Sequence, residues 1–208
     1  AIGRYAFYGD KALRNVIIPG SVKEIGYGAF YMFYGLTDVT ISEGVTSIES
    51  FAFQWGSGLT KVVLPKSITS LGNGVFEDCE NLTEMEIPEG ITTIKYRMFE
   101  NCRNIISVAV PESVISIEDE AFASCSNLKD VYYSGTKSQW HAISISSVGN
   151  SYLGNATIHF AHIVITYDYA TNGGTSATKN GEKLVWGDEG DLSVSATKPG
   201  WEFVGWNT

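Results

Sequence analysis

Apolar residues recur with a period of 23 along residues 2–134 of the chain. Each unit begins with an aliphatic residue at position 1, carries Phe at position 6 and Leu or Ile at position 12, and has apolar residues at positions 15 and 17. Six units keep this register without a gap, which indicates an internal structural repeat. The units begin at Ile2, Ile25, Ile48, Leu71, Ile94 and Ile117, and their sixth positions are Phe7, Phe30, Phe53, Phe76, Phe99 and Phe122.

Positions 14 to 17 of each unit predict a short β-strand. Side chains alternate along a strand, so positions 15 and 17 share one face and positions 14 and 16 share the other. In four units a Pro follows at position 18, where it removes a backbone donor and ends the strand. A repeat of about 20–29 residues with this strand pattern is typical of a leucine-rich-repeat solenoid, in which neighbouring units bury one another's apolar residues.

The outward positions 14 and 16 form the first candidate binding surface. Stacked strands align them on the concave face of the sheet, which repeat proteins commonly use to bind partners. The plain alternative is a sheet surface that binds nothing. The row is acidic toward its middle and favours a partner with a basic patch. The candidate ligand-binding residues are Asp38, Thr40, Lys61, Val63, Glu84, Glu86, Ser107, Asp130 and Tyr132.

A second candidate surface is an aromatic patch in the first three units, made of Tyr31, Phe33, Tyr34 and Trp55. Exposed clusters of such rings are typical of surfaces that contact a glycan or a protein. The alternative is that the rings fill irregular turns or pack on neighbouring repeats. Exposed coplanar rings would favour a carbohydrate-binding module, and buried rings would exclude that function for the patch.

The three cysteines occupy the same position of successive units. Cys79, Cys102 and Cys125 all fall at position 9, so we expect them to stack in adjacent coils. Three thiols in a row make an open line rather than a closed tetrahedral metal site, and an odd number argues against a disulfide framework. The pattern therefore predicts a buried ladder of small side chains.

Composition and charge exclude several functions. The 208 residues carry a net charge of −9, from 14 Lys and Arg against 23 Asp and Glu, so there is no general basic surface for nucleic acid or an anionic membrane. No apolar run reaches the roughly 18 residues of a membrane span. The acidic residues around Glu77 and Asp78 lack the ligand spacing of an EF-hand loop and are expected to form a solvated face.

The sequence also lacks the common catalytic motifs. It has no nucleophile elbow, zinc-protease motif, phosphate-binding loop or dinucleotide-binding motif. The histidines, His141, His159 and His162, are too few to make a convincing metal cluster. His159 alternates with Ile158 and Phe160, so its side chain is expected to face away from theirs. We expect no catalytic residues, no metal site, no cofactor and no enzymatic activity.

The repeat I-x-x-x-A-F-x-x-C-x-N-L-x-x-V-x-I-P resembles the BspA-type leucine-rich repeat of bacterial surface proteins over about residues 1–134, most closely at residues 117–128. The segment from about 131 to 161 is similar to that family's terminal coil, with Trp140 as a candidate lid over the last apolar layer. The resemblance implies a mainly β fold, a right-handed leucine-rich-repeat solenoid of 23-residue repeats over residues 1–161.

After Ala161 the repeat register is lost. The turn at residues 172–175 and the aromatic run at residues 200–206 are similar to the Listeria–Bacteroides repeat of the internalin B type. Asp168 lies two residues further from Asn172 than that pattern has it, and the pattern's last strand is missing. Residues 162–208 are therefore expected to form a partial β-grasp-like module.

The two resemblances imply a bacterial protein that is secreted or held at the cell surface. They imply adhesion to a protein of the host matrix or of a bacterial surface, or to a glycan, with no nucleic acid and no membrane insertion. Two other functions stay open. One is a carbohydrate-binding module that uses the aromatic patch, and the other is a passive spacer that displays a domain outside this sequence.

Overall fold

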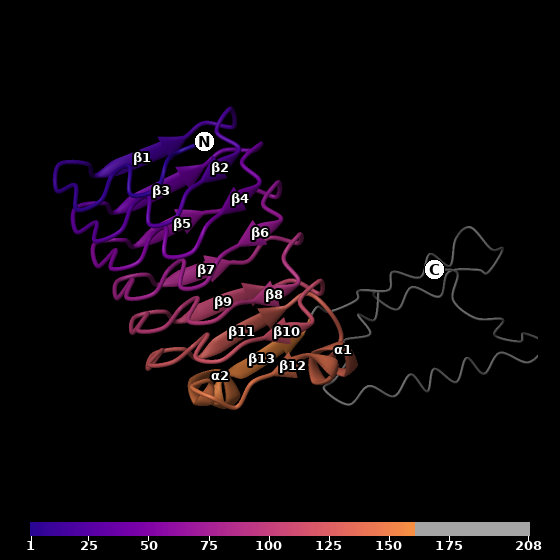
Figure 1. Cartoon of the computed structure of the whole chain (residues 1–208). Coiled ribbons are helices and arrows are strands. Elements are labelled where there is room, and N and C mark those ends of the chain that lie inside the picture. Colours follow the sequence, from indigo (N-terminus) through magenta and orange to yellow (C-terminus); the bar gives the residue numbers. More distant parts are fainter. Residues whose placement is uncertain (161–208) are drawn as a thin grey trace, which may run out of the picture. The chain divides into compact units, whose positions relative to one another are not determined.

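The computed structural model describes residues 1–160, which form a parallel β-solenoid of six repeats closed by a cap (Figure 1). The predicted β-grasp-like module, residues 162–208, lies outside the described residues. Each repeat makes one coil, because its apolar positions can be buried only against the coils on either side. The solenoid and its cap confirm the mainly β fold expected from the repeat.

The strands at positions 14 to 17 line one side of the solenoid, as predicted, in one ladder of three strands and one of four. They pair in parallel with the residue one repeat away, so that Val16 lies beside Val39 and Val39 beside Val62. The cap adds a seventh strand. The long strands are β1 (Asn15–Ile18), β3 (Asp38–Ile41), β5 (Lys61–Val63), β7 (Glu84–Glu86), β9 (Ser107–Val110), β11 (Asp130–Tyr133) and β13 (Thr157–Phe160).

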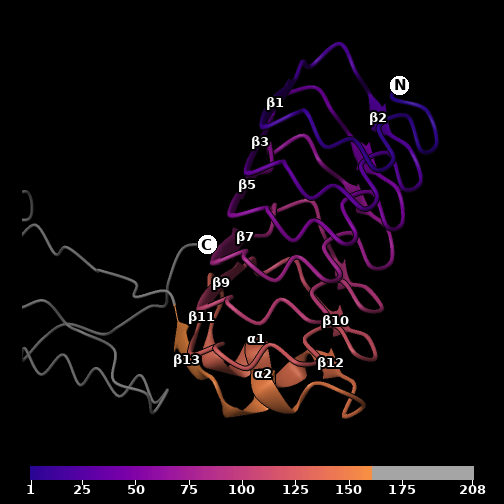
Figure 2. The same ribbon diagram turned by 90° about the vertical axis from the view of Figure 1, so that its left-hand side faces the viewer.

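A second row of two-residue strands, which the sequence did not predict, lies on the opposite side of the solenoid (Figure 2). Five of these strands end at the aliphatic residue that opens a repeat, and that residue is buried. The sixth, β12, belongs to the cap, and both of its residues are exposed. The short strands are β2 (Glu24–Ile25), β4 (Ser47–Ile48), β6 (Ser70–Leu71), β8 (Thr93–Ile94), β10 (Ser116–Ile117) and β12 (Ser144–Ile145).

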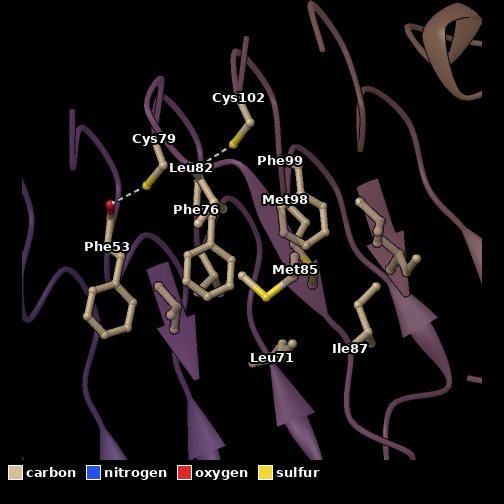
Figure 3. Close-up of a cluster of buried hydrophobic side chains, with 14 of the residues drawn as sticks. Phe53, Leu71, Phe76, Cys79, Leu82, Met85, Ile87, Met98, Phe99 and Cys102 are labelled. Atoms are coloured by element: carbon tan, nitrogen blue, oxygen red, sulfur yellow. Dashed lines mark hydrogen bonds between the residues drawn. The ribbon is translucent and has the colours of Figure 1, made fainter. Parts of the chain in front are cut away.

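The phenylalanines of position 6 stack through the core between the two rows. Phe53, Phe76 and Phe99 have nearly parallel rings, with centroids 5.8 and 5.7 Å apart and interplanar angles of 8° (Figure 3). Each ring is at most 1% exposed. Because offset stacking of aromatic rings is favourable and each ring buries a large apolar area, this column is a major source of stability.

The turn that leads to the long strand has the same two left-handed backbone positions in all six repeats. Positions 4 and 8 have positive φ in every unit, with values between 53° and 66°. This left-handed conformation favours glycine, and a residue with a Cβ pays roughly 1 kcal/mol to adopt it. The positions are Tyr5, Gly28, Phe51, Gly74, Arg97 and Glu120, and then Gly9, Met32, Trp55, Asp78, Asn101 and Ser124.

The cysteines form the buried ladder that the register predicts. Cys79, Cys102 and Cys125 are fully buried and free. Each thiol donates to the backbone carbonyl of the core phenylalanine one coil earlier, at 3.2 Å for Cys79 to Phe53 and 3.1 Å for Cys102 to Phe76 (Figure 3). A small side chain with a weak donor fits this position, because it fills the space and satisfies the carbonyl.

The native thiols are expected to be unreactive. Burial raises the pKa of all three, and that of Cys125 reaches about 12. Since the thiolate is the reactive form, the folded protein at pH 8 should resist alkylation by iodoacetamide for hours, and all three thiols should react after unfolding in guanidinium. Mass spectrometry of the alkylated chain measures this. Rapid labelling of a native cysteine would contradict the ladder.

The cap closes the last coil with two short helices, α1 (Lys137–Ala142) and α2 (Ser151–Asn155). Trp140 is buried and packs edge-on against Tyr133 at 5.2 Å, as predicted for a lid. Asn150 replaces the backbone of a missing coil. Its side chain accepts from the Phe122 amide at 3.0 Å and donates to the Glu118 carbonyl at 2.9 Å. Buried backbone groups at the end of the solenoid are thereby paired.

The strand pairing is interrupted once, between the third and fourth coils. The long strands form the ladders β1-β3-β5 and β7-β9-β11-β13, and the short strands divide at the same level into β2-β4-β6 and β8-β10-β12. The two coils are still joined through their turns. The Phe51, Phe53 and Trp55 amides donate to the carbonyls of Asn73, Val75 and Glu77 at 2.9, 3.0 and 2.9 Å.

Candidate functional site

The first candidate site is the sheet face, which we define as the side chains at positions 14 and 16 of the long strands. On β3, Val39 and Ile41 are buried while Asp38 and Thr40 are exposed, which confirms the predicted alternation. All nine predicted ligand-binding residues lie on this face. Ser107 and Asp130 are half-buried and the others are exposed. Ligand binding by these residues stays a prediction.

Within each of the two ladders, parallel pairing lines up positions 14 and 16 in two rows. In the first row Asp38 lies beside Lys61, and in the second Thr40 lies beside Val63. Three apolar side chains stand exposed on the face: Ile17 at 75%, Val63 at 45% and Tyr132 at 51%. Single exposed apolar residues are ordinary, but these three lie on the same face of the solenoid, with charged neighbours. That mixture suits a protein interface, where apolar contacts are surrounded by polar ones.

His159 extends the sheet face into the cap. It faces away from the core, as predicted, and its Nε2 lies 2.7 Å from Asp130 Oδ1. The His159 ring also stacks on Tyr132, with centroids 4.8 Å apart and an interplanar angle of 17°. These contacts hold Tyr132 in one orientation. His159 lies outside the six repeats, so the repeat pattern could not predict that it joins the binding residues.

The predicted aromatic patch does not form as one surface, since Phe33 is in the core. Phe33 is 1% exposed and packs edge-on against Phe30 at 6.0 Å. The physical reason is its register, because position 9 is the buried position that the cysteines fill in later coils. Tyr34 and Trp55 are exposed. Tyr31 instead stacks on Tyr8 at 5.7 Å and lines a separate groove.

The second candidate site is this groove on the turns, which we name the tyrosine groove. Its volume of about 710 Å³ lies within the rough range of 300–1,000 Å³ typical of small-ligand sites. Aromatic rings from the first three coils form most of its walls, and polar side chains from the third to fifth coils form one end. The lining residues are Tyr5, Tyr8, Tyr27, Tyr31, Phe51, Gln54, Glu77, Tyr96 and Arg97.

Glycines shape the groove. Along position 4 of the turns, large side chains alternate with glycine, in the order Tyr5, Gly28, Phe51, Gly74 and Arg97. A Cβ at Gly28 would lie 2.5 Å from the Tyr5 ring, and one at Gly74 would lie 2.5 Å from the Phe51 ring. Each ring therefore lies across the glycine of the next coil, in space that any other residue would occupy.

The polar end of the groove surrounds one guanidinium with carboxylates. Arg97 Nε lies 2.6 Å from Glu120 Oε2 and 3.0 Å from Glu100 Oε2, and Arg97 Nη1 lies 3.8 Å from Glu77 Oε1. Glu77 is only 6% exposed, and its Oε2 has no hydrogen-bond partner in the described part of the chain. A buried acceptor without a donor is costly, so this atom marks a place where a ligand could donate.

Burial, and after it the nearby carboxylates of Glu100 and Asp78, raise the pKa of Glu77 to about 7, although Arg97 and a hydrogen bond from Gln54 act to lower it. Glu77 and Asp78 are both buried. The expectation of a solvated acidic face is therefore wrong for these two residues. This cluster could not be predicted from the sequence, because Arg97 and Glu120 come from later coils and meet Glu77 only through the stacking of the coils.

The repeat length, the strand in each coil and the stacked phenylalanine core define a leucine-rich-repeat solenoid. Within that class, the model of the BspA type leucine rich repeat region matches in six copies over residues 1–129 and 48–169, so the chain belongs to this family. Members are typically proteins of the bacterial surface or secreted proteins, bind other proteins and are not enzymes. No curated protein matched the chain.

Solved structures share the fold. The T. pallidum leucine rich repeat protein is 31% identical with a TM-score of 0.61, over 62% of this chain and 61% of that one. A leucine-rich repeat protein from Eubacterium ventriosum is 26% identical with a TM-score of 0.54, over 62% and 34% of the two chains. One from Bacteroides ovatus, at 24% identity and a TM-score of 0.52, covers 74% and 44%. The chain thus spans less than two thirds of these proteins.

Both helices in residues 1–160 belong to the cap and are short. Neither they nor any other segment of this described part forms a helix of the length and apolarity that a membrane crossing requires.

Proposed function

We propose that this chain is the adhesive module of a bacterial surface or secreted protein, and that its sheet face binds a protein partner of the host matrix or of another bacterial surface. The observation that carries the proposal is the alignment of outward side chains along the long strands, in which exposed Ile17, Val63 and Tyr132 stand among charged side chains. Because the paired strands hold these side chains in place, less conformational entropy is lost when a partner binds.

Tyr132 is the best candidate for an energetically dominant contact. Tyrosine is enriched among the few residues that dominate binding energy, and stacking on His159 fixes its ring before a partner arrives. The acidic side chains of β7, Glu84 and Glu86, lie near the middle of the face and are exposed. They favour a partner with a basic patch, whose association would depend on salt.

Binding of the 208-residue chain to an immobilised panel of matrix proteins and mucins tests this function. Tyr132→Ala is expected to weaken saturable binding roughly tenfold, and Glu86→Lys to slow association most strongly at low salt. Tyr152→Ala is the matched control, because Tyr152 is an exposed tyrosine on α2, outside the sheet face.

Surface plasmon resonance at several salt concentrations gives the affinities and association rates. Binding that survives Tyr132→Ala and Glu86→Lys but is lost in Tyr152→Ala would move the ligand site away from the sheet face. Absence of binding to every protein on the panel would support the passive-spacer function.

A further inference from the structure

We propose that the tyrosine groove is a second binding site, separate from the sheet face, and that it takes a neutral oligosaccharide. The groove lies on the turns of the coils, whereas the sheet face lies on the long strands. A ligand can therefore occupy the groove without contacting any of the nine residues assigned to protein binding.

The walls of the groove offer partly exposed aromatic surface. The Tyr8 ring stacks on Tyr31, and the Tyr5 ring meets Tyr27 edge-on at 5.5 Å. Phe51 meets Tyr27 in the same edge-on way, also at 5.5 Å, so the rings form one connected wall. A pyranose ring has an apolar side of C–H groups that packs on such surfaces, while its hydroxyl groups remain free at the rim.

The groove keeps this shape because of its backbone. Gly28 and Gly74 leave room for the Tyr5 and Phe51 rings, and a Cβ at either glycine would collide with a ring. The binding surface is thus built by the stacking of coils and is present without a ligand. A preformed aromatic wall loses little conformational entropy on binding.

The polar end supplies the hydrogen bonds that a sugar needs. Glu77 Oε1 faces Arg97, whereas Glu77 Oε2 is buried without a donor and belongs to a residue that lines the groove. Gln54 lines the same end. A sugar hydroxyl can donate to Glu77 Oε2 and so pair the unsatisfied acceptor, while the Gln54 side chain hydrogen-bonds the Glu77 carboxyl.

Charge around the groove favours a neutral ligand over a charged one. The Arg4 guanidinium already lies 4.7 Å from the Tyr27 ring centre, and the Arg97 guanidinium lies 4.9 Å from that of Tyr96. Both disfavour a further cation. The carboxylates of Glu77, Glu100 and Glu120 around Arg97 disfavour an anion. A proline-rich peptide fits the rings but has few N–H groups to satisfy Glu77.

A printed array of neutral oligosaccharides, made of glucose, galactose and N-acetylglucosamine oligomers, tests the proposal with the 208-residue chain. The best glycan is then titrated in solution by NMR. Tyr31→Ala and Phe51→Ala are each expected to weaken its binding about tenfold through lost stacking. Glu77→Gln should weaken it several-fold, because an amide group replaces the carboxylate acceptor.

Trp55→Ala is the matched control, because Trp55 is an exposed aromatic residue of the same turns that does not line the groove. The Trp55→Ala variant is expected to bind the glycan with the same affinity as the unaltered chain. Urea midpoints identify any variant that has lost the fold, and Tyr31→Phe, which keeps the ring, should retain binding. This variant separates loss of stacking from loss of structure.

Several results would overturn the proposal. They are the absence of millimolar or tighter binding to every glycan on the array, unchanged binding in Tyr31→Ala and Phe51→Ala, and loss of binding in Trp55→Ala alone. Binding of a proline-rich peptide to the groove in place of any glycan would also overturn it. Because the sheet-face variants are different residues, failure here leaves the protein-binding proposal intact.

Discussion

Replacing Phe76 with alanine is expected to lower the free energy of unfolding by about 3–5 kcal/mol. The Phe76 ring is fully buried and stacks on Phe53 and Phe99, so its removal leaves a cavity in the middle of the column that neighbouring coils cannot easily fill. Guanidinium denaturation followed by far-UV circular dichroism measures the change.

Phe7→Ala is the matched control for this experiment. Phe7 occupies the same repeat position in the first coil, is 37% exposed and, within residues 1–160, stacks on Phe30 alone. Its replacement is expected to cost about 1–2 kcal/mol, since part of the ring surface is already in water. Equal losses for Phe7→Ala and Phe76→Ala would contradict the conclusion that stability depends on burial within the column.

Replacing Glu77 with glutamine is expected to stabilise the protein above neutral pH. The pKa of Glu77 is about 7 in the folded protein against an ordinary value of 4.5, so the folded state binds its proton more tightly than the unfolded state does. The free energy of unfolding therefore falls as pH rises from about 4.5 to 7, and it stays at this lower level above pH 7. Glutamine does not ionise and should recover roughly 1–3 kcal/mol at pH 8.

Urea denaturation of the variant and the unaltered chain at pH 4.5 and pH 8 checks this result. The two proteins should have nearly equal stability at pH 4.5, where Glu77 is protonated. Glu80→Gln, at an exposed acidic neighbour, serves as the control and should show little change at either pH. A loss of stability in Glu77→Gln at pH 8 would mean that the ion pair with Arg97 outweighs the cost of burial.

The core could be predicted from the sequence because each core position repeats in residue type as well as in place. Phe76 and Cys102 recur with identical residues one repeat away, and the period alone places them in buried columns. The same register predicts that Phe33 is buried, since Phe33 shares position 9 with the cysteines. Aromatic character suggested exposure, and the register, which predicts burial, was the better guide.

The short strands and the tyrosine groove could not be predicted in this way. A two-residue strand such as Ser47–Ile48 is too short to show an alternating pattern. Position 4 holds residues as different as Tyr5, Gly28 and Arg97, so its regular backbone leaves no periodic residue type in the sequence. The groove depends on how unlike side chains of adjacent coils meet, which only the three-dimensional stacking decides.

The interrupted strand pairing between the third and fourth coils has a mechanical consequence. When strands are paired, a force along the solenoid axis must break many backbone hydrogen bonds together. At this level the load rests on the turn-side bonds, such as that from Phe53 to Val75, and on the contact between the Phe53 and Phe76 rings. Under tension the solenoid should part here first, and each half would keep its own ladders intact.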